Sequence, residues 1–273
     1  MNEIAESHVL AKQGNLLFKK VKILHVKALL TPHTFCWMNH SKEDMASLLL
    51  DKTIEDVRAS AHYLRFMFQD GTELSVAEDV SIRYIKIEEE SQKHQLFIEF
   101  DNGYALEFKV KLYGFILFGR EGELKRDFPY YRKAIEAINP LSEAFTYPYF
   151  IKRTELDGKK GSVKQQLATD QRLPGLGNGT LQDILFHAKL SPKRKVSTLD
   201  ESDRLRLYHE VIQTIDRMIL FEGRDTTVDF LNEKGRYEVI MRSDRTHCPL
   251  CNTPLIKEAY LGGKVIYCPQ CQS

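Results

Sequence analysis

Apolar residues recur at two different periods along the chain, and the change of period predicts two kinds of domain. An amphipathic helix is expected over residues 5–17. Strand-like sequence follows, with hairpins predicted around Gln69-Asp70-Gly71 and Asp101-Asn102-Gly103. The expected strands are Val21 to Ala28, Tyr63 to Phe68, Thr72 to Val76, Leu96 to Phe100, Tyr104 to Val110 and Phe115 to Phe118. This pattern predicts a two-layer β-sandwich flanked by the first helix.

Helical sequence dominates the second half of the chain. The segments Asn139-Pro140-Leu141-Ser142 and Tyr147-Pro148 mark the expected hinge before it. Thr198 and Glu201 have the spacing of a capping box, which predicts the start of a long helix running through Ile219. The fold class expected from these patterns is α+β, with the strands first and the helices after them.

One stretch of the helical half, from Arg172 to Val196, has the pattern of a ligand-binding loop. Three glycines and a proline alternate with leucines before a helix that is expected to begin at Thr180. The free N–H groups at that helix start and the side chain of Asn178 suit a phosphate. Lys193, Arg194 and Lys195 follow the helix as a positive cluster. The alternative is an ordinary glycine-rich loop before a core helix.

The four cysteines at the end of the chain predict a metal site. Cys248 and Cys251 form one C-x2-C pair, Cys268 and Cys271 form another, and 16 residues separate the pairs. Four thiolates at this spacing close a tetrahedral zinc site with no open position, so one structural Zn²⁺ is expected. The fifth cysteine, Cys36, lies between Phe35 and Trp37 and is interpreted as a buried apolar residue.

Charge is distributed unevenly between the two halves. Residues 1–150 contain 19 Lys and Arg against 22 Asp and Glu, whereas residues 151–273 contain 20 against 16. A nucleic-acid footprint is therefore expected in the C-terminal half. No apolar run approaches the roughly 20 residues of a membrane span, and the N-terminus lacks the basic residues of a signal peptide. A cytoplasmic protein with no membrane partner is expected.

The sequence LPGLGNGTLQDILF resembles the helix-two-turns-helix signature of the formamidopyrimidine-DNA glycosylase and endonuclease VIII family. With the cysteine pairs, the resemblance covers essentially the whole chain. It implies an N-terminal β-sandwich of catalytic type over 1–145, a helix-two-turns-helix DNA-binding domain over 146–240 and a zinc-ribbon finger over 241–273. It also implies that Asn178 binds a phosphate of the damaged strand.

The family's chemistry belongs to the N-terminus, where a proline amine attacks the sugar C1′ to form a Schiff base and the adjacent glutamate shuttles protons. This chain begins Met1-Asn2-Glu3-Ile4-Ala5-Glu6. Glu3 and Glu6 match the family's acidic pair, although both also suit a helix start. Asn2 replaces the nucleophile, and because Asn is not small, Met1 is expected to stay and to supply the amine. Weak lyase activity is the result expected.

Other positions match the family's DNA contacts with altered residues. His62, in Ala61-His62-Tyr63-Leu64, replaces a strand lysine that touches phosphate. Lys111 and Tyr113 occupy the place of residues that fill the gap left by a flipped nucleotide, with Tyr113 as a stacking wedge or, alternatively, a plain sheet-edge aromatic. Glu78 and Asp79 fall where the family has a methionine-containing loop, and an acidic pair facing DNA is unfavourable.

A further family contact falls within the zinc ribbon, where an arginine reaches the DNA backbone. Counted from Cys268, the matching position here is Gly263, with Lys264 one place further on.

The function implied is base-excision repair: a monomeric, nucleoid-associated N-glycosylase and abasic-site lyase that flips damaged bases out of duplex DNA. The first alternative is a catalytically silent protein that binds lesions or abasic sites with the same fold. A third interpretation is a zinc-ribbon protein that binds RNA or another protein and has no preference for lesions.

Overall fold

A computed structural model describes residues 2–273 of the chain, which form two compact units. The first unit contains the residues up to Glu136 together with the segment Thr227–Gly235, and the second contains Ala137–Thr226 and Arg236–Ser273. The predicted hinge begins just after the boundary at Glu136. Whether 1–145, 146–240 and 241–273 act as three domains remains a proposal.

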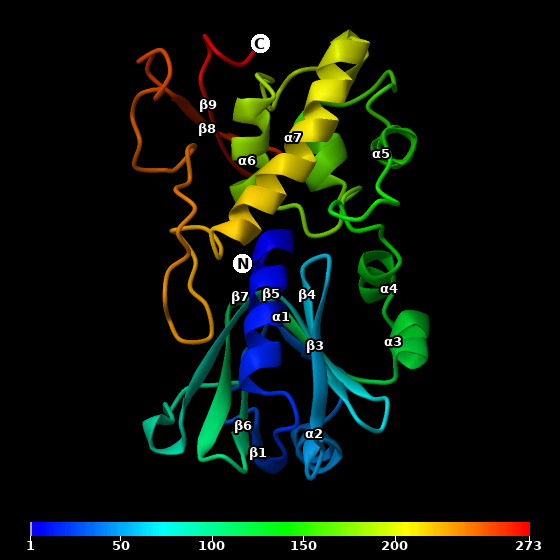
Figure 1. The fold of residues 1–273 in the computed structure, drawn as a ribbon, viewed down its shortest axis with the longest axis vertical. Coiled ribbons are helices and arrows are strands. Elements are labelled where there is room, and N and C mark those ends of the chain that lie inside the picture. Colours follow the sequence, from blue (N-terminus) through cyan, green and yellow to red (C-terminus); the bar gives the residue numbers. More distant parts are fainter. Residues whose placement is uncertain (1) are drawn as a thin grey trace. The chain divides into compact units, whose positions relative to one another are not determined.

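The first unit is built on helix α1 (Ile4–Leu17) and a seven-stranded sheet (Figure 1). The sheet order is β1-β6-β7-β5-β4-β3, and β2 pairs in parallel with β7. The strands are β1 (Ile23–Ala28), β2 (Cys36–Met38), β3 (Ile54–Ser60), β4 (Tyr63–Phe68), β5 (Glu73–Lys86), β6 (Leu96–Phe100) and β7 (Tyr104–Gly119). Its other helices are α2 (Lys42–Leu49), the 3₁₀ turn η1 (Ile87–Glu89), α3 (Glu121–Asp127) and α4 (Pro129–Ile135).

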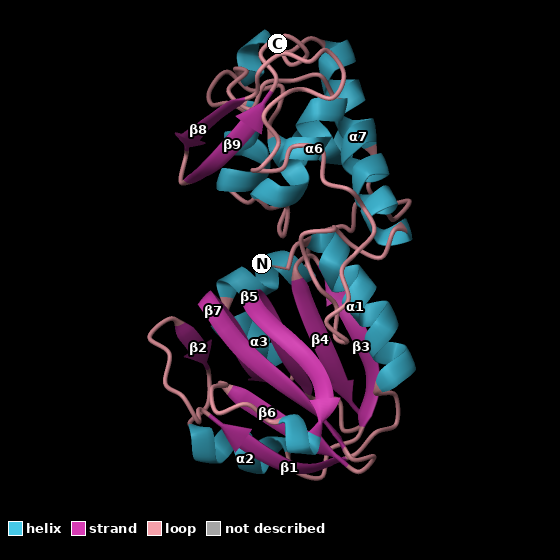
Figure 2. Ribbon diagram, turned by 90° about the vertical axis from the view of Figure 1, so that its left-hand side faces the viewer, coloured by secondary structure: helices cyan, strands magenta, loops and turns pink. Residues whose placement is uncertain are grey.

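The expected sandwich is confirmed, because the long strands β5 and β7 curve so that their two ends serve different layers (Figure 2). Phe66 of β4 and Phe108 of β7 meet in the core with ring centroids 6.1 Å apart. Phe18, just after α1, is fully buried and contacts Phe66 and Phe100 from the two layers. Burial of these aromatic rings supplies much of the apolar contact that holds the layers together.

Three local predictions for this unit need correction. The strand expected over Thr72 to Val76 begins at Glu73 and continues to Lys86. The segments expected as two strands, 104–110 and 115–118, form the single strand β7. His62 does not lie in a strand, because Ala61 and His62 form the turn between β3 and β4, and Ala61 has a φ of +52°.

The second unit is helical, followed by a two-stranded ribbon. Its elements are α5 (Tyr147–Thr154), the π-helix η2 (Gln165–Thr169), α6 (Asn178–His187), the 3₁₀ turn η3 (Val196–Thr198), α7 (Glu201–Leu220), β8 (Ile256–Tyr260) and β9 (Gly263–Tyr267). The long helix α7 was predicted correctly, but its capping box was not. Asp200 and Asp203 form the box, since Thr198 belongs to the preceding 3₁₀ turn.

Two side chains of α6 fasten it to the C-terminal segments. The amide oxygen of Gln182 accepts a hydrogen bond from the N–H of Ile266 at 2.6 Å. Asp183 is fully buried and accepts the N–H groups of Ile240 and Met241 at 2.9 and 2.8 Å. Because these acceptors satisfy backbone donors that a loop otherwise leaves buried and unpaired, they fix the ribbon on α6.

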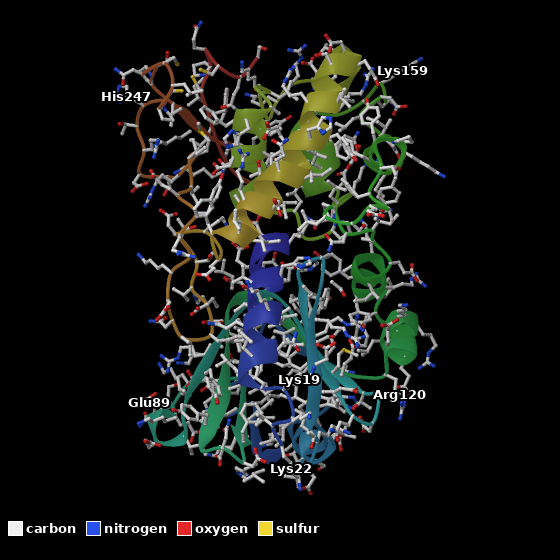
Figure 3. All side chains as sticks on the ribbon, in the orientation of Figure 1. Lys19, Lys22, Glu89, Arg120, Lys159 and His247 are labelled. Carbon is white, nitrogen blue, oxygen red and sulfur yellow. The ribbon has the colours of Figure 1, made fainter. Side chains whose placement is uncertain are left out.

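Polar and charged side chains cover the outside of each unit, among them the six residues labelled in Figure 3, Lys19, Lys22, Glu89, Arg120, Lys159 and His247. Within residues 2–273, no helix combines the length and apolar character that crossing a bilayer requires.

Candidate functional site

The acidic residues near the N-terminus are buried and hold the start of α1. Glu3 and Glu6 are 5% and 4% exposed. The N–H of Glu3 donates to Glu6 Oε2 at 3.1 Å, and the side chain of Glu3 accepts the N–H of Glu6, which completes a capping box. The N–H of Asn2 donates to the carbonyl oxygen of Glu78 at 3.2 Å. Met1, the residue expected to carry the amine, lies outside the described residues.

His62 and Glu78 form a buried pair close to this start. Both side chains are almost completely buried, and His62 Nε2 lies 3.2 Å from Glu78 Oε1. The hydroxyl of Tyr130, on α4, donates to Glu78 Oε1 at 2.8 Å. His62 was expected at a phosphate, but here its ring lies against a carboxylate, and neither ring nitrogen meets the geometry of a hydrogen bond within residues 2–273.

The pKa of Glu78 is lowered despite its burial. Burial alone raises the pKa of a carboxyl, but the neighbouring His62 ring and the hydroxyl groups of Tyr130 and Tyr113 hold the pKa of Glu78 below its usual range. Glu78 also has a φ of +70° at a bulge in β5, a conformation that a non-glycine residue rarely adopts. Of the acidic pair expected to face DNA, Glu78 therefore does not do so, since it points into the protein.

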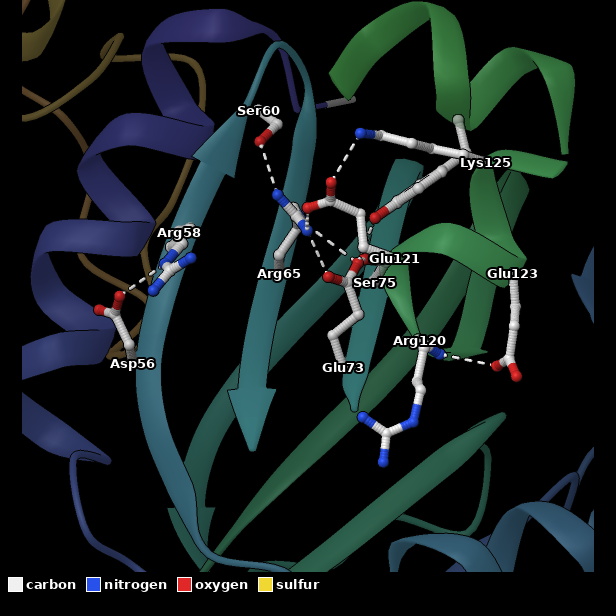
Figure 4. Close-up of polar contacts among 11 residues, drawn as sticks. Asp56, Arg58, Ser60, Arg65, Glu73, Ser75, Arg120, Glu121, Glu123 and Lys125 are labelled. Carbon is white, nitrogen blue, oxygen red and sulfur yellow. Dashed lines mark hydrogen bonds and ion pairs between the residues drawn. The ribbon is translucent and has the colours of Figure 1, made fainter. Parts of the chain in front are cut away.

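A second buried ion pair fixes the helices beside this cluster (Figure 4). Arg65 of β4 binds Glu73 through Nε at 3.1 Å and through a second, shorter contact, and binds Glu121 of α3 at 2.7 Å. The hydroxyl of Tyr131 on α4 donates to Glu73 Oε1 at 2.5 Å. Since Tyr131 directly follows Tyr130 on the same helix, this network helps to set where the Tyr130 hydroxyl lies.

Lys111 and Tyr113 project from an interruption of the β5–β7 pairing. Glu78 pairs with Gly114 and Val80 pairs with Val110, so three residues, Lys111 to Tyr113, lie opposite the single residue Asp79. Lys111 is exposed and Tyr113 is partly exposed. Burial and the nearby Glu78 carboxylate raise the pKa of Tyr113 to about 12, which keeps its hydroxyl protonated. The bulge therefore presents both side chains outside the regular ladder.

Asn178 is the first residue of α6, and its side chain is not used to cap the helix. The N-cap residue is Gly177. The Asn178 Oδ1 is buried and accepts no hydrogen bond within residues 2–273. Gly263 lies so close that a Cβ there would overlap Asn178 Nδ2, so a side chain at this position would displace the Asn178 amide from where it lies here. Lys264, one place on, is exposed.

The structure brings one lysine to this region that the sequence did not single out. Lys164 is 2% exposed, and its Nζ donates to the carbonyl oxygen of Leu261 at 3.2 Å and to Thr169 Oγ1 at 3.3 Å. Burial lowers the pKa of its ammonium. The surrounding sequence, Ser-Val-Lys-Gln-Gln-Leu-Ala, does not distinguish a buried lysine from a solvated one.

The basic cluster is partly neutralised within the protein. Lys193 pairs with Glu258 at 3.2 Å and lies over the ring of Tyr260, while Arg194 bonds Thr198 and lies 3.6 Å from Asp203. Lys195 is exposed and has no ion-pair partner among residues 2–273. Exposed pairs of this kind contribute little stability and can be exchanged for phosphate contacts.

The four terminal cysteines converge, as their spacing predicts, and could hold a metal ion. Their sulfur atoms all lie within 4.8 Å of one another. The Cys251 Sγ is 3.5 Å from that of Cys268 and 3.4 Å from that of Cys271, and Cys248 is 3.8 Å from Cys271. These separations fit the edges of a thiolate tetrahedron, which measure about 3.8 Å when each metal–sulfur bond is about 2.3 Å.

Comparison with known proteins identifies the helical region. The family model described as the formamidopyrimidine-DNA glycosylase H2TH domain matches residues 137–229. A formamidopyrimidine-DNA glycosylase of Carboxydothermus hydrogenoformans is 30% identical over 138 residues, 49% of this chain and 52% of that protein. The protein of the same name from Pelotomaculum thermopropionicum is 27% identical over 274 residues, 96% of this chain and 94% of its own.

Solved structures match the whole chain. The MutM (Fpg) protein of Thermus thermophilus superposes with a TM-score of 0.83 at 22% identity, over 99% of this chain and 98% of that one. Lactococcus lactis Fpg, in complex with DNA containing an abasic site, gives a TM-score of 0.85 at 22% identity and covers 99% of both chains. The domain match and the full-length relatives agree that the chain is similar to formamidopyrimidine-DNA glycosylases, and the solved structures show that it shares their fold.

Proposed function

We propose that this protein is a base-excision repair DNA glycosylase with abasic-site lyase activity, which recognises damaged bases in duplex DNA by flipping them. The observation that carries the proposal is the match over 96% of the chain to a relative named formamidopyrimidine-DNA glycosylase. With such a substrate, the proposed location of the protein is the chromosome, in the cytoplasm.

In the proposed reaction, the N-terminal amine attacks C1′ of the damaged nucleotide. The bond from C1′ to the base breaks, and the base leaves with a proton from the amine. The C1′–O4′ bond then breaks, O4′ takes a proton, and the amine nitrogen becomes doubly bonded to C1′ as a Schiff base. Glu3 moves the protons, and Glu6 holds the Glu3 backbone through its 3.1 Å hydrogen bond. Met1 supplies the amine in front of Asn2. A free α-amine has a pKa of about 7.7 to 8.0, so a useful fraction is neutral near pH 7.

Borohydride trapping tests the proposal. The intact protein is incubated with duplexes that carry an abasic site, 8-oxoguanine, a formamidopyrimidine or an oxidised pyrimidine, and reduced. We expect a covalent adduct that peptide mapping assigns to residue 1, formed about 100-fold more slowly than with a proline-bearing relative, because the extra residue moves the amine from its attack position. Tight binding to an abasic-site analogue without excision or adduct on all four substrates would instead show a silent lesion-binding protein.

DNA contacts are proposed for Asn178 and for the basic side chains Lys193, Arg194 and Lys264 of the second unit, and for Lys111 and Tyr113 of the first. His62 is buried against Glu78, so no direct DNA contact is proposed for it. Within residues 2–273 the Oδ1 of Asn178 has no hydrogen-bond partner, and its side chain does not cap α6. Both observations support a role for the Asn178 amide in ligand binding. Within the basic cluster, Lys195 is not held by an ion pair as Lys193 and Arg194 are, so its contact with phosphate should respond most to salt.

Replacing Asn178 with Ala should weaken duplex binding about 10- to 100-fold, because a hydrogen bond to a charged group is lost. The loss should be the same for every DNA sequence, since a phosphate contact carries no sequence information. Gly263→Ala offers an independent route, because its Cβ displaces the Asn178 amide. Fluorescence anisotropy measures affinity and thermal unfolding measures stability. Unchanged affinity with a lower melting temperature in both variants would reduce Asn178 to a structural role.

We further propose that the ion bound by Cys248, Cys251, Cys268 and Cys271 is zinc. The set is all thiolate, the spacing is that of zinc ribbons, and the sulfur separations suit a four-coordinate ion. Four protein ligands leave no position for water or substrate, so the ion's role is to fold the ribbon, and the reaction does not pass through it.

A further inference from the structure

Five aromatic residues of the first unit form a continuous, partly exposed surface, which we call the aromatic surface: Phe35, Trp37, Tyr113, Phe115 and Tyr130. Phe35 is 54% exposed, Trp37 is 45% exposed and Tyr130 is 37% exposed. Large aromatic side chains are normally buried in a soluble domain. A group of them on the surface indicates a binding site for a planar, apolar group.

Backbone pairing fixes the centre of this surface. Strand β2 pairs in parallel with β7 so that Trp37 lies in register with Phe115. Their rings stack with centroids 5.0 Å apart and planes 23° apart. Phe35 and Tyr113 approach Trp37 at 6.2 and 6.4 Å, and Tyr130 approaches Phe115 at 5.8 Å. The rings are therefore held in place before any ligand arrives.

The polar ends of the two tyrosines are turned toward the protein. Tyr130 donates to Glu78 Oε1 at 2.8 Å, and Tyr113 also hydrogen bonds to the Glu78 carboxylate. His62 packs against Tyr130 with ring centroids 5.4 Å apart and contacts the same carboxylate. Because one buried carboxylate binds both hydroxyl groups, the edges and faces of the rings, and not the hydroxyls, are what the surface offers. Glu78 is a positioning residue for the aromatic surface.

We propose that the aromatic surface binds an unpaired nucleobase by stacking, with Trp37 as the principal stacking residue. The occupant we infer is the base left without a partner in a duplex that lacks a base opposite it. This inference rests on the proposed function and extends it, since it adds Trp37, Phe35 and the Glu78 anchor to a lesion-facing set that sequence resemblance limits to Lys111 and Tyr113.

Two features favour a nucleobase as the occupant. The surface is continuous with the bulge that carries Lys111, an exposed cation with no ion-pair partner among residues 2–273, so a phosphate can be bound beside the stacked ring. The Glu78 carboxylate, which contacts the two tyrosines, is buried, so a phosphate bound at the surface does not come into direct contact with it. Stacking on aromatic residues next to a backbone-binding cation is how proteins bind unpaired bases irrespective of sequence.

Binding of a base at Trp37 can be followed by intrinsic fluorescence, because Trp37 is the only tryptophan in the chain. Intrinsic fluorescence is followed while the full-length protein is titrated with a duplex that carries a tetrahydrofuran abasic-site analogue, and with the matched intact duplex. Anisotropy of labelled DNA shows in parallel that both are bound. Stacking predicts that tryptophan emission is quenched by the abasic duplex and stays nearly unchanged with the intact one.

Trp37→Leu should bind the abasic duplex about 5- to 150-fold more weakly, with intact-duplex affinity unchanged, whereas Trp37→Phe should keep most of the affinity. Leu24→Ala, which removes an equally exposed apolar side chain from β1, is the control and should change neither affinity. Thermal unfolding checks that all variants are folded.

Equal quenching by both duplexes, or no quenching together with unchanged abasic-duplex affinity in Trp37→Leu, would overturn the inference. So would self-association of the DNA-free protein that Trp37→Leu abolishes, since the surface would then hold a second copy of the chain. If stacking fails these tests but borohydride adducts still form, the proposed function stands without the stacking inference. If excision and adducts are absent but quenching is retained, the protein is not the proposed enzyme, and the base-binding surface stands.

Discussion

Glu3→Gln is expected to lower base excision and strand cleavage by about 10³-fold and to abolish the borohydride adduct. A general acid–base group contributes about 10²- to 10⁴-fold to a rate, and Glu3 is the carboxylate next to the proposed amine. Glutamine keeps the size of the side chain and can still accept the N–H of Glu6, so the helix start survives while proton transfer is lost. Single-turnover excision on the best of the four substrates measures the effect.

Glu6→Gln is the matched control for this variant. It removes the other carboxylate of the same capping box, whose Oε2 accepts the N–H of Glu3. If the loss in Glu3→Gln came from a disturbed helix, Glu6→Gln would show an equal loss of rate and both variants would melt at lower temperature. We expect Glu6→Gln to lose less activity, because Glu6 acts only through the position of Glu3. Retention of more than a tenth of wild-type excision in Glu3→Gln would contradict the role assigned to Glu3.

Cys268→Ser is expected to remove the metal ion and with it the fold of the ribbon. Structural zinc supplies about 10–16 kcal/mol of binding free energy in zinc-finger peptides, and this energy is also folding energy. Cys248 and Cys268 pack with Phe186 of α6 and Ile266 of β9 in one apolar cluster. Loss of the metal should therefore expose Phe186 and release the hydrogen bond between Gln182 and Ile266.

Metal analysis, hydrogen exchange and duplex affinity measure this result together. We expect less than a tenth of a zinc ion per chain in Cys268→Ser, fast exchange over 248–271, and duplex affinity lowered by at least about 100-fold, since the ribbon also positions Gly263 beside Asn178. Exchange in the first unit should be unchanged. Cys36→Ser is the control, because burial raises the pKa of that thiol to about 11 and it lies outside the cluster. One full equivalent of zinc in purified Cys268→Ser would exclude the proposed ligand set.

Features that depend only on residues close together in the sequence were predicted well. The strands Tyr63–Phe68 and Leu96–Phe100 have the bounds expected, because a period of two with a turn sequence behind it is a local property. The cysteine spacing likewise indicated which four thiols meet. The misassigned capping box shows the limit of local patterns, since Thr198 and Asp200 both suit a cap and the 3₁₀ turn before α7 decides between them.

The sequence by itself determined the α+β class, the position of the glycine-rich loop, the four cysteines and the acidic pair at the N-terminus. Only the tertiary structure decided what those residues touch. Glu78, interpreted from the sequence as an acid facing DNA, is buried because a bulge turns it toward His62 and Tyr130, which come from two other elements. The space beside Gly263 is occupied by the Asn178 amide, which comes from a distant part of the sequence. Such pairings arise from long-range packing, which no local period or spacing encodes.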